Sequence, residues 1–333
     1  MIASLLSYGW WIAIMLIIIG FIALVKGADY LVDGASSIAK RFGISDLIIG
    51  LTVVAFGTSM PEFVVNMVSV AEGSSDLAIT NILGSNIINT FVILGLTALV
   101  YPVSSHKRSR DFDIPMSIIA GVLVLLFVVI PLPIGEHACG IGRIGGIILL
   151  LLFSFFLYNT YRHAKDHPKD AISEITNEGA KEISARRAIA LIFVGFIGLI
   201  VGGELIVQSA INIAQRMGVS EAIIGLTIVA LGTSLPELAT SVIAAFKHNS
   251  DIALGNVIGS NIFNVFFVLG MSATIRPLPA YSGIELDAVM TALGSVIVWL
   301  AIKTNPKHKI QRWAGALLLI VYAGYLTYRL LQV

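Results

Sequence analysis

The stretch IIGLTVVAFGTSMPE at residues 48–62 occurs a second time, as IIGLTIVALGTSLPE, at residues 223–237. Twelve of the 15 positions are identical, and the offset is 175 residues. The same offset relates GSNIIN at 84–89 to GSNIFN at 259–264. Self-similarity at one fixed offset in two separate motifs indicates an internal duplication. The chain is therefore predicted to consist of two equivalent halves.

The composition places both halves in a membrane. Hydrophobic residues make up 57% of the 333 residues and charged residues only 12%, with a mean hydropathy of +0.92. This balance is too apolar for a soluble domain of such length. The net charge of +1 offers no broad basic surface, which argues against nucleic-acid binding. We expect a multi-pass protein of the cell membrane whose partner is the lipid bilayer, with no obligatory protein partner.

The apolar stretches predict an all-α membrane protein. A bilayer core about 30 Å thick requires about 20 apolar residues per helix. Cutting the stretches at their polar residues gives ten transmembrane helices, at 8–39, 44–70, 77–100, 112–131, 142–161, 187–215, 219–246, 252–275, 284–303 and 311–331.

The duplication groups these helices into two sets of five. The first repeat is expected at 1–161, with its duplicated motif region at 44–100, and the second at 187–333, with its motif region at 219–275. A cytoplasmic linker at 162–186 joins them. Because five is odd, the second repeat begins on the opposite side of the membrane, so the repeats are inverted. Inverted repeats with a binding site at their interface are typical of secondary transporters.

Two carboxylates lie deep inside predicted helices. Glu62 and Glu237 occupy equivalent positions of the repeats, and no Lys or Arg falls within either helix. An ionised carboxylate at this depth costs at least about 2 kcal/mol unless it is paired. Protonation or a hydrogen bond to a hydroxyl would explain a single buried Glu equally well. The duplication instead favours a cation held between two facing carboxylates.

The neighbouring residues supply further oxygen ligands. Pro61 and Pro236 lack an amide hydrogen, so each is expected to kink its helix and to release a backbone carbonyl in mid-membrane. Hydroxyls lie one turn before the carboxylates on the same face, from Thr58, Ser59, Thr233 and Ser234. Such hard ligands suit Ca²⁺ or Na⁺, and the lack of paired His or Cys argues against zinc, copper or iron.

The helices at 77–100 and 252–275 are expected to form the second wall of this site. Polar residues recur in them at every fourth position and so share one helix face: Asn81, Ser85 and Asn89 in one, Asn256, Ser260 and Asn264 in the other. We favour coordination for Ser85, Ser260, Asn89 and Asn264. Coordination and helix packing are equally open for the pairs Asn81 and Asn256, and Asn86 and Asn261.

The motifs GTSMPE at 57–62, GTSLPE at 232–237, and GSNIIN and GSNIFN resemble the α-repeats of the sodium/calcium exchanger family, prokaryotic type, within the calcium/cation antiporter superfamily. The resemblance covers all ten helices in order. It implies that Glu62 and Glu237 hold Ca²⁺, with help from the backbone carbonyls of Thr58 and Thr233. The sodium sites would be completed by Ser59, Ser234, Ser85, Ser260 and the carbonyls of Ala55 and Ala230.

The resemblance implies a secondary antiporter that exchanges Na⁺ for Ca²⁺ by alternating access, without a cofactor. Proton/calcium antiport through the same carboxylates is the alternative, although proton-coupled relatives tend to have Asn where Thr58 and Thr233 stand. A channel is less favoured because a single inverted repeat is typical of alternating access. The chain has no HExxH pair, nucleophile elbow or phosphate loop, so we do not expect an enzyme.

One position departs from some relatives. The potassium-dependent branch and several prokaryotic members have Asp where this chain has Asn264. Only two formal negative charges then remain in the cavity. They balance one Ca²⁺ but not a larger load of Na⁺ or an added K⁺, so we expect electrogenic exchange without a potassium requirement.

The distribution of positive charge predicts the orientation. Sixteen Lys and Arg residues fall in the alternate loops that include 162–186, and four fall on the other side. Positive loops are retained in the cytoplasm, which places both termini and the loop near Gly140 outside. Cysteines substituted for Lys169 and Lys307, in a Cys139→Ser background, should react with an impermeant reagent only from the cytoplasm. External labelling of both would falsify the assignment.

Overall fold

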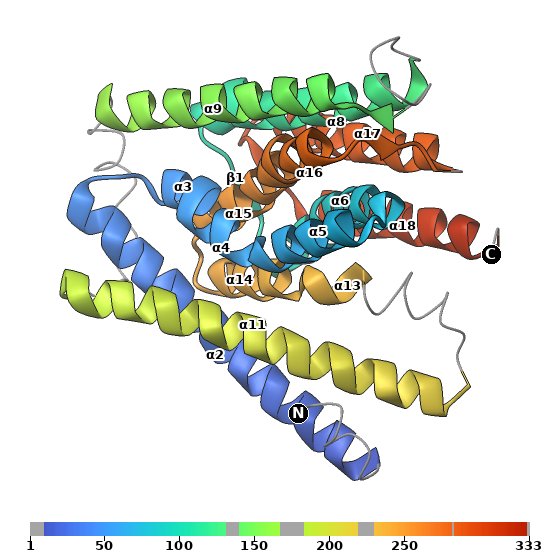
Figure 1. The fold of residues 1–333 in the computed structure, drawn as a ribbon. Helices are drawn as coiled ribbons and strands as arrows, with labels where there is room; N and C mark the ends of the chain where they lie inside the picture. Colours follow the sequence, from blue (N-terminus) through green and yellow to red (C-terminus); the bar gives the residue numbers. More distant parts are fainter. Residues whose placement is uncertain (1–9, 131–139, 167–182, 219–229, 282, 332–333) are drawn as a thin grey trace.

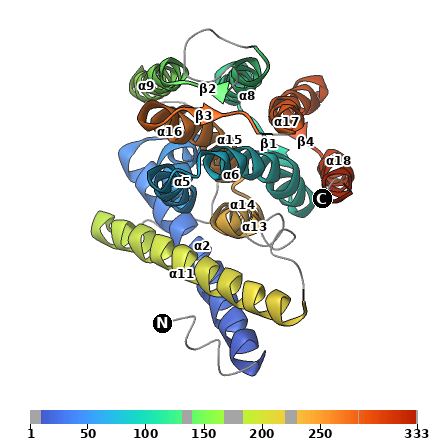
Figure 2. The ribbon, with the colours of Figure 1, turned by 45° about the vertical axis from the view of Figure 1, so that its right-hand side comes forward.

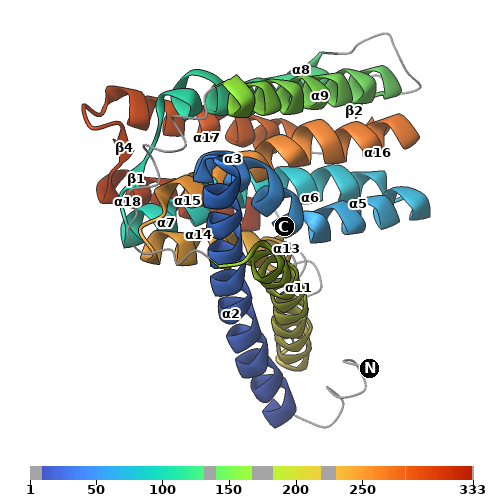
Figure 3. The same cartoon turned by 90° about the vertical axis from the view of Figure 1, so that its left-hand side faces the viewer.

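The computed structural model of the chain describes residues 10–130, 140–166, 183–218, 230–281 and 283–331, and these form a bundle of helices in layers (Figures 1 and 2). Two long crossing helices, α2 (Trp10–Phe42) and α11 (Ala185–Arg216), lie together on one side of the remaining helices (Figure 3). The helices α8 and α9 form the opposite layer, and the duplicated segments lie between the two layers.

The middle layer contains two long interrupted helices. One runs from α6 (Ser75–Ile87) through the π-helical turn η2 (Ile88–Ile93) into α7 (Leu94–Val100). Its equivalent runs from α15 (Ser250–Ile262) through η5 (Phe263–Leu269) into α16 (Gly270–Ile275). The span of α15 to α16 is almost wholly buried, and its apolar side chains form the centre of the main hydrophobic core. These helices therefore provide the fixed frame on which the site is built.

The duplicated stretch of the first repeat forms a broken helix. It passes through α3 (Asp46–Ile49), η1 (Gly50–Val54) and α4 (Ala55–Thr58), and then bends by 46° into α5 (Met60–Glu72). In the second repeat, α13 (Ala230–Thr233) and α14 (Leu235–Phe246) show the same break. The kink expected at Pro61 is confirmed by the 46° bend, and the helix is interrupted at the equivalent place before Pro236.

The remaining helices cover this frame. They are α8 (Ile114–Val129), entered through η3 (Ser109–Asp113), α9 (Arg143–Asp166), α17 (Ile284–Thr304) and α18 (Arg312–Leu330). Two antiparallel strand pairs connect their loops: β1 (Val103–Ser104) with β4 (Lys309–Ile310), and β2 (Gly140–Ile141) with β3 (Leu278–Pro279). Each pair joins loops that the charge count places on the same side of the membrane.

The described residues agree with an all-helical, multi-pass membrane protein, to which the four two-residue strands are a small addition. Among these residues, eight helices are long and apolar enough to cross a membrane, and the bent segment 46–72 raises the number to nine. The helix expected at 219–246 lies outside the described residues from 219 to 229, and only its last part is seen, as α13 and α14. The linker expected at 162–186 is shorter at both ends, because α9 continues to Asp166 and α11 begins at Ala185; its residues 167–182 lie outside the description.

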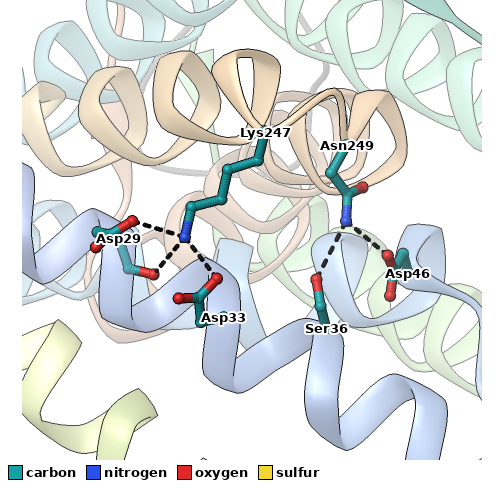
Figure 4. Close-up of polar contacts among 6 residues, drawn as sticks. All are labelled: Asp29, Asp33, Ser36, Asp46, Lys247 and Asn249. Atoms are coloured by element: carbon teal, nitrogen blue, oxygen red, sulfur yellow. Dashed lines mark hydrogen bonds and ion pairs between the residues drawn. The ribbon is translucent and has the colours of Figure 1, made fainter. Parts of the chain in front are cut away.

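Ion pairs tie α2 to the corner between α14 and α15 (Figure 4). Lys247 Nζ lies 2.6 Å from Asp29 Oδ1 and 2.5 Å from Asp33 Oδ1. Beside it, Asn249 Nδ2 donates to Ser36 Oγ at 3.1 Å and to Asp46 Oδ2 at 2.6 Å. The 175-residue offset relates Lys247 to Glu72 and Asp29 to Glu204, so the other repeat cannot form the same ion pair.

The crossing of α2 and α11 depends on glycine. A Cβ on Gly27 would lie 2.8 Å from the carbonyl oxygen of Gly195, and one on Gly202 would lie 2.6 Å from that of Gly20. These are backbone atoms, which cannot move aside as a side chain can. The two helices therefore touch backbone to backbone, as expected of small residues at membrane helix interfaces.

We predict that Gly27→Ala separates the two helices and lowers the stability of the folded protein by about 1–3 kcal/mol, the usual cost of overpacking. Gly203→Ala is the matched control, because its Cβ would meet only Leu24 Cδ1, at 4.0 Å. Thermal unfolding of the purified variants in detergent checks this. Equal melting temperatures for the two variants would contradict a backbone contact at Gly27.

Candidate cation site

The two breaks place the two carboxylates at equivalent points. Ser59 (φ −85°, ψ 8°) separates α4 from α5, and Ser234 (φ −87°, ψ 3°) separates α13 from α14. Glu62 and Glu237 therefore lie in the first turn of the helices that follow. Both side chains are completely buried. The partial positive charge at the start of each helix favours a carboxylate there, which offsets part of the cost of burial.

The carboxylate of Glu237 is held from the first repeat. Ser59 Oγ donates to Glu237 Oε1 at 2.7 Å, and Ser260 Oγ of α15 donates to the same oxygen at 3.4 Å. The shorter bond crosses from one repeat to the other, because Ser59 stands at the break of the first.

The carboxylate of Glu62 is held in the same manner but more loosely. Its Oε1 accepts from Ser85 Oγ of α6 at 3.2 Å and from Ser234 Oγ at 3.5 Å. The hydroxyls of Ser85 and Ser234 are also 3.1 Å apart, so either one can donate to the other in place of the carboxylate. The expected serines thus surround the two carboxylates, each of which is bound by one serine from its own repeat and one from the other.

One oxygen of each carboxylate remains available. Within the described part of the chain, Glu62 Oε2 and Glu237 Oε2 are buried and have no hydrogen-bond partner. A buried charged oxygen without a partner is unfavourable, whereas the same oxygen is a strong ligand for a hard cation. The arrangement therefore suits a cation that binds between the serines and the two free oxygens.

The asparagines of the second wall differ from each other. Asn264 Nδ2 donates to Ser85 Oγ at 3.3 Å and to Asn86 Oδ1 at 3.1 Å, while its Oδ1 has no partner among the described residues. Asn89 is fully buried, and neither of its amide atoms makes a hydrogen bond in the same part of the chain. Both residues lie in the π-helical turns η2 and η5, and such turns frequently occur at functional sites.

The threonines before the breaks also differ. Thr58 Oγ1 donates to Asn256 Oδ1 at 3.0 Å and lies 3.3 Å from the carbonyl oxygen of Ala55, which also accepts from Ser59 N at 3.0 Å. Thr233 Oγ1 is buried and makes no hydrogen bond to Asn81. Ala230 begins α13 as Ala55 begins α4, so both alanines stand one turn before their breaks.

For Asn86, Asn261 and Asn256, the sequence left cation coordination and helix packing equally open, and their contacts favour packing. Asn86 Nδ2 donates to the carbonyl of Asn261 at 3.1 Å, and Asn261 Nδ2 donates to Thr90 Oγ1 at 2.8 Å, so these two hold α15 to α6 and to η2, which continues α6. Asn256 bonds to Thr58 at the first break and to Glu237 and Ser241 of α14. The sequence analysis missed its partner Ser241 and the equivalent Asn66; both stand four residues after a site glutamate, a spacing that places them on its helix face.

The family follows from comparison with known proteins. The model of the sodium/calcium exchanger protein family matches residues 12–162 and 187–331. The chain belongs to the sodium/calcium exchanger family. Among the similar proteins, the putative antiporter CaxA from Alkalimonas amylolytica is 35% identical over 318 residues, which cover 94% of this chain and 97% of CaxA.

Other exchangers are similar over the same length. The sodium/calcium exchanger MaX1 from Methanosarcina acetivorans is 33% identical over 342 residues, covering 94% of this chain and 97% of MaX1. Structures of the sodium-calcium exchanger NCX_Mj superpose with a TM-score of 0.79 at 31% identity, over 95% of this chain and 97% of that one. Family membership therefore rests on nearly the whole chain, and the chain is a membrane antiporter rather than an enzyme.

Proposed function

We propose that this chain exchanges Na⁺ for Ca²⁺ by alternating access, with Glu62 and Glu237 as the charged ligands of one central site. The observation that carries the proposal is the pair of buried carboxylates, each with one oxygen bound by serines and the other without a partner in the described residues. Two ionised carboxylates with free oxygens are costly inside a membrane protein, and a cation bound between them removes that cost.

The ligand chemistry supports Ca²⁺ and Na⁺ as the ions. The proposed ligands are carboxylate, hydroxyl, amide and carbonyl oxygens of the twelve residues Glu62, Glu237, Thr58, Thr233, Ser59, Ser234, Ser85, Ser260, Asn89, Asn264, Ala55 and Ala230. Hard cations bind such oxygens, whereas soft transition metals select thiolate or imidazole. Groups of three or more His, Cys, Asp or Glu suited to a metal do not occur within the described ranges.

The proposed architecture has ten transmembrane helices in two inverted repeats, with 1–161 and 187–333 as the repeats and both termini outside. Three features support it. The breaks of both repeats have the same backbone angles, the strand pairs join loops assigned to one side, and α2 and α11 come from equivalent positions of the two repeats. The site lies at the interface of the repeats, where such transporters bind their substrates.

The charges of the site indicate whether exchange moves net charge across the membrane. One Ca²⁺ balances Glu62 and Glu237, whereas a load of more than two Na⁺ leaves surplus positive charge in the site. The exchange is therefore electrogenic, and with Asn at position 264 it needs no K⁺ to balance a third carboxylate. Calcium-45 uptake into proteoliposomes under an imposed sodium gradient, compared with an imposed proton gradient, tests the proposal. Uptake driven only by protons would favour the alternative of proton/calcium antiport.

Glu62→Gln and Glu237→Gln should each reduce sodium-driven calcium uptake to background, because each removes one of the two charges that neutralise Ca²⁺. The variants should fold at least as stably as the wild type, since a buried charge has been removed. Glu72→Gln is the control, because Glu72 ends α5 and is exposed. Uptake by either site variant at the rate of Glu72→Gln would eliminate the paired-carboxylate site.

Asn264→Asp should make uptake sensitive to pH near neutrality or responsive to K⁺. Asn264 reaches Glu62 through Ser85, so a carboxylate there adds a third charge that a proton or a further cation must balance. Asn264→Ala should do neither and should only weaken exchange. Sodium-driven uptake is measured at several pH values with and without K⁺ in all three proteins. Identical pH profiles of the wild type and Asn264→Asp, or a wild-type requirement for K⁺, would contradict this role.

A further inference from the structure

Asn256 connects the two broken helices through its side-chain amide. It lies on α15 and is completely buried. Its Oδ1 accepts from Thr58 Oγ1, the last residue of α4, at 3.0 Å. Its Nδ2 donates to Ser241 Oγ at 2.9 Å and to the carbonyl oxygen of Glu237 at 3.2 Å, both on α14. One amide therefore fixes the break of the first repeat against the site helix of the second.

The duplication specifies an equivalent set of bonds around Asn81. Subtracting or adding 175 relates Asn256 to Asn81, Thr58 to Thr233, and Ser241 to Asn66. The equivalent bonds would run from Thr233 Oγ1 to Asn81 Oδ1, and from Asn81 Nδ2 to Asn66 Oδ1 and to the carbonyl oxygen of Glu62.

None of these equivalent bonds is made. Within the described part of the chain, Asn81 Nδ2, Asn66 Oδ1 and Thr233 Oγ1 are buried and make no hydrogen bond. The carbonyl of Glu62 accepts instead from Asn66 Nδ2 at 3.1 Å. Buried polar atoms are nearly always paired in stable structures, so three unpaired atoms at one set of equivalent positions require an explanation.

The serines at the breaks show the same difference between the repeats. Ser59 Oγ is 2.7 Å from Glu237 Oε1, whereas Ser234 Oγ is 3.5 Å from Glu62 Oε1. The contacts from the second wall differ much less, at 3.2 Å for Ser85 and 3.4 Å for Ser260. Among the serine contacts, the asymmetry is therefore larger at the breaks than on the second wall.

We propose that Asn256 and Asn81 are positioning residues that engage in turn: the Asn256 amide holds the break at Ser59 in the state described here, and the Asn81 amide holds the break at Ser234 in the opposite-facing state. The inference rests on the proposed alternating access. In a transporter built from two inverted repeats, each repeat adopts in one state the conformation that its equivalent adopts in the other. The atoms left unpaired around Asn81 are then the donors and acceptors of the opposite state.

This arrangement gives each state contacts that the other lacks, and such differences set the equilibrium between them. Losing the Asn256 contacts should shift the population toward the opposite-facing state. Losing the Asn81 contacts should shift it toward the state described here. One hydrogen bond of ordinary net strength corresponds to a change of about three- to tenfold in the ratio of the two states.

The test is hydrogen–deuterium exchange of the full-length protein in lipid nanodiscs, with the segments 55–62 and 230–237 followed separately. Asn256→Ala should increase deuterium uptake in 55–62 and decrease it in 230–237, because the second break becomes the one that is held. Asn81→Ala should leave 55–62 at least as protected as in the wild type. In the double variant the ratio of uptake between the two segments should return toward the wild-type value.

The matched control is Asn86→Ala, a buried amide that joins the same two helices without touching either break. Asn86→Ala should change the deuterium uptake of both segments in the same direction. The proposal would be wrong if Asn256→Ala or Asn81→Ala changed the deuterium uptake of both segments in the same direction. It would also be wrong if the uptake ratio of the double variant lay further from the wild type than that of Asn256→Ala. In either case the two asparagines would be packing contacts only. If Asn256→Ala does not fold, Ser241→Ala removes one bond of the same amide and should give a smaller shift in the same direction.

The measurement is separable from the proposed ion specificity. It reads the balance between two conformations of the purified protein and needs no sodium-driven uptake. A chain that fails to exchange Na⁺ for Ca²⁺ could still show the opposed shifts, and a chain that exchanges these ions could fail to show them.

Discussion

The structure is organised around the burial of two carboxyl groups in an apolar molecule. Glu62 and Glu237 are completely buried, and each retains one oxygen without a partner in the described residues. The breaks place each carboxylate at the positive end of a helix, and serines from both repeats bind its other oxygen. These features reduce the cost of the charges without removing it. Under the proposed function, a bound cation removes the cost that remains.

The sequence predicted the parts of the site that lie within one helix. Proline after Ser59 and Ser234 indicated the breaks, and the period of four indicated which residues share a face with Ser85 and Ser260. It could not predict the contacts between repeats. Ser59 binds Glu237 rather than Glu62, and Thr58 binds Asn256. These contacts depend on which helices face each other, and the duplicated sequence does not indicate that.

Two other features could not be read from the chain. The π-helical turns at Asn89 and Asn264 contain the same apolar residues as the α-helices beside them, so composition gives no signal for the extra residue per turn. The ends of the helices at the linker were also misplaced, because the polar residues up to Asp166 continue α9 beyond the apolar stretch that was used to define it. Local polarity marks where a chain can leave the membrane and not where the helix ends.

The backbone contact between α2 and α11 has a mechanical consequence. At Gly20, Gly27, Gly195 and Gly202 the two helices meet backbone to backbone, so no side chain at these points can absorb a displacement. One helix comes from each repeat, so the pair is a stiff lever shared by both halves. Between Gly27 and Gly34, this lever is held to the rest of the bundle by charge, where Lys247 meets Asp29 and Asp33. A displacement of either helix is therefore passed to the other repeat, while the partly exposed ion pairs that hold the lever weaken as the ionic strength of the solution rises.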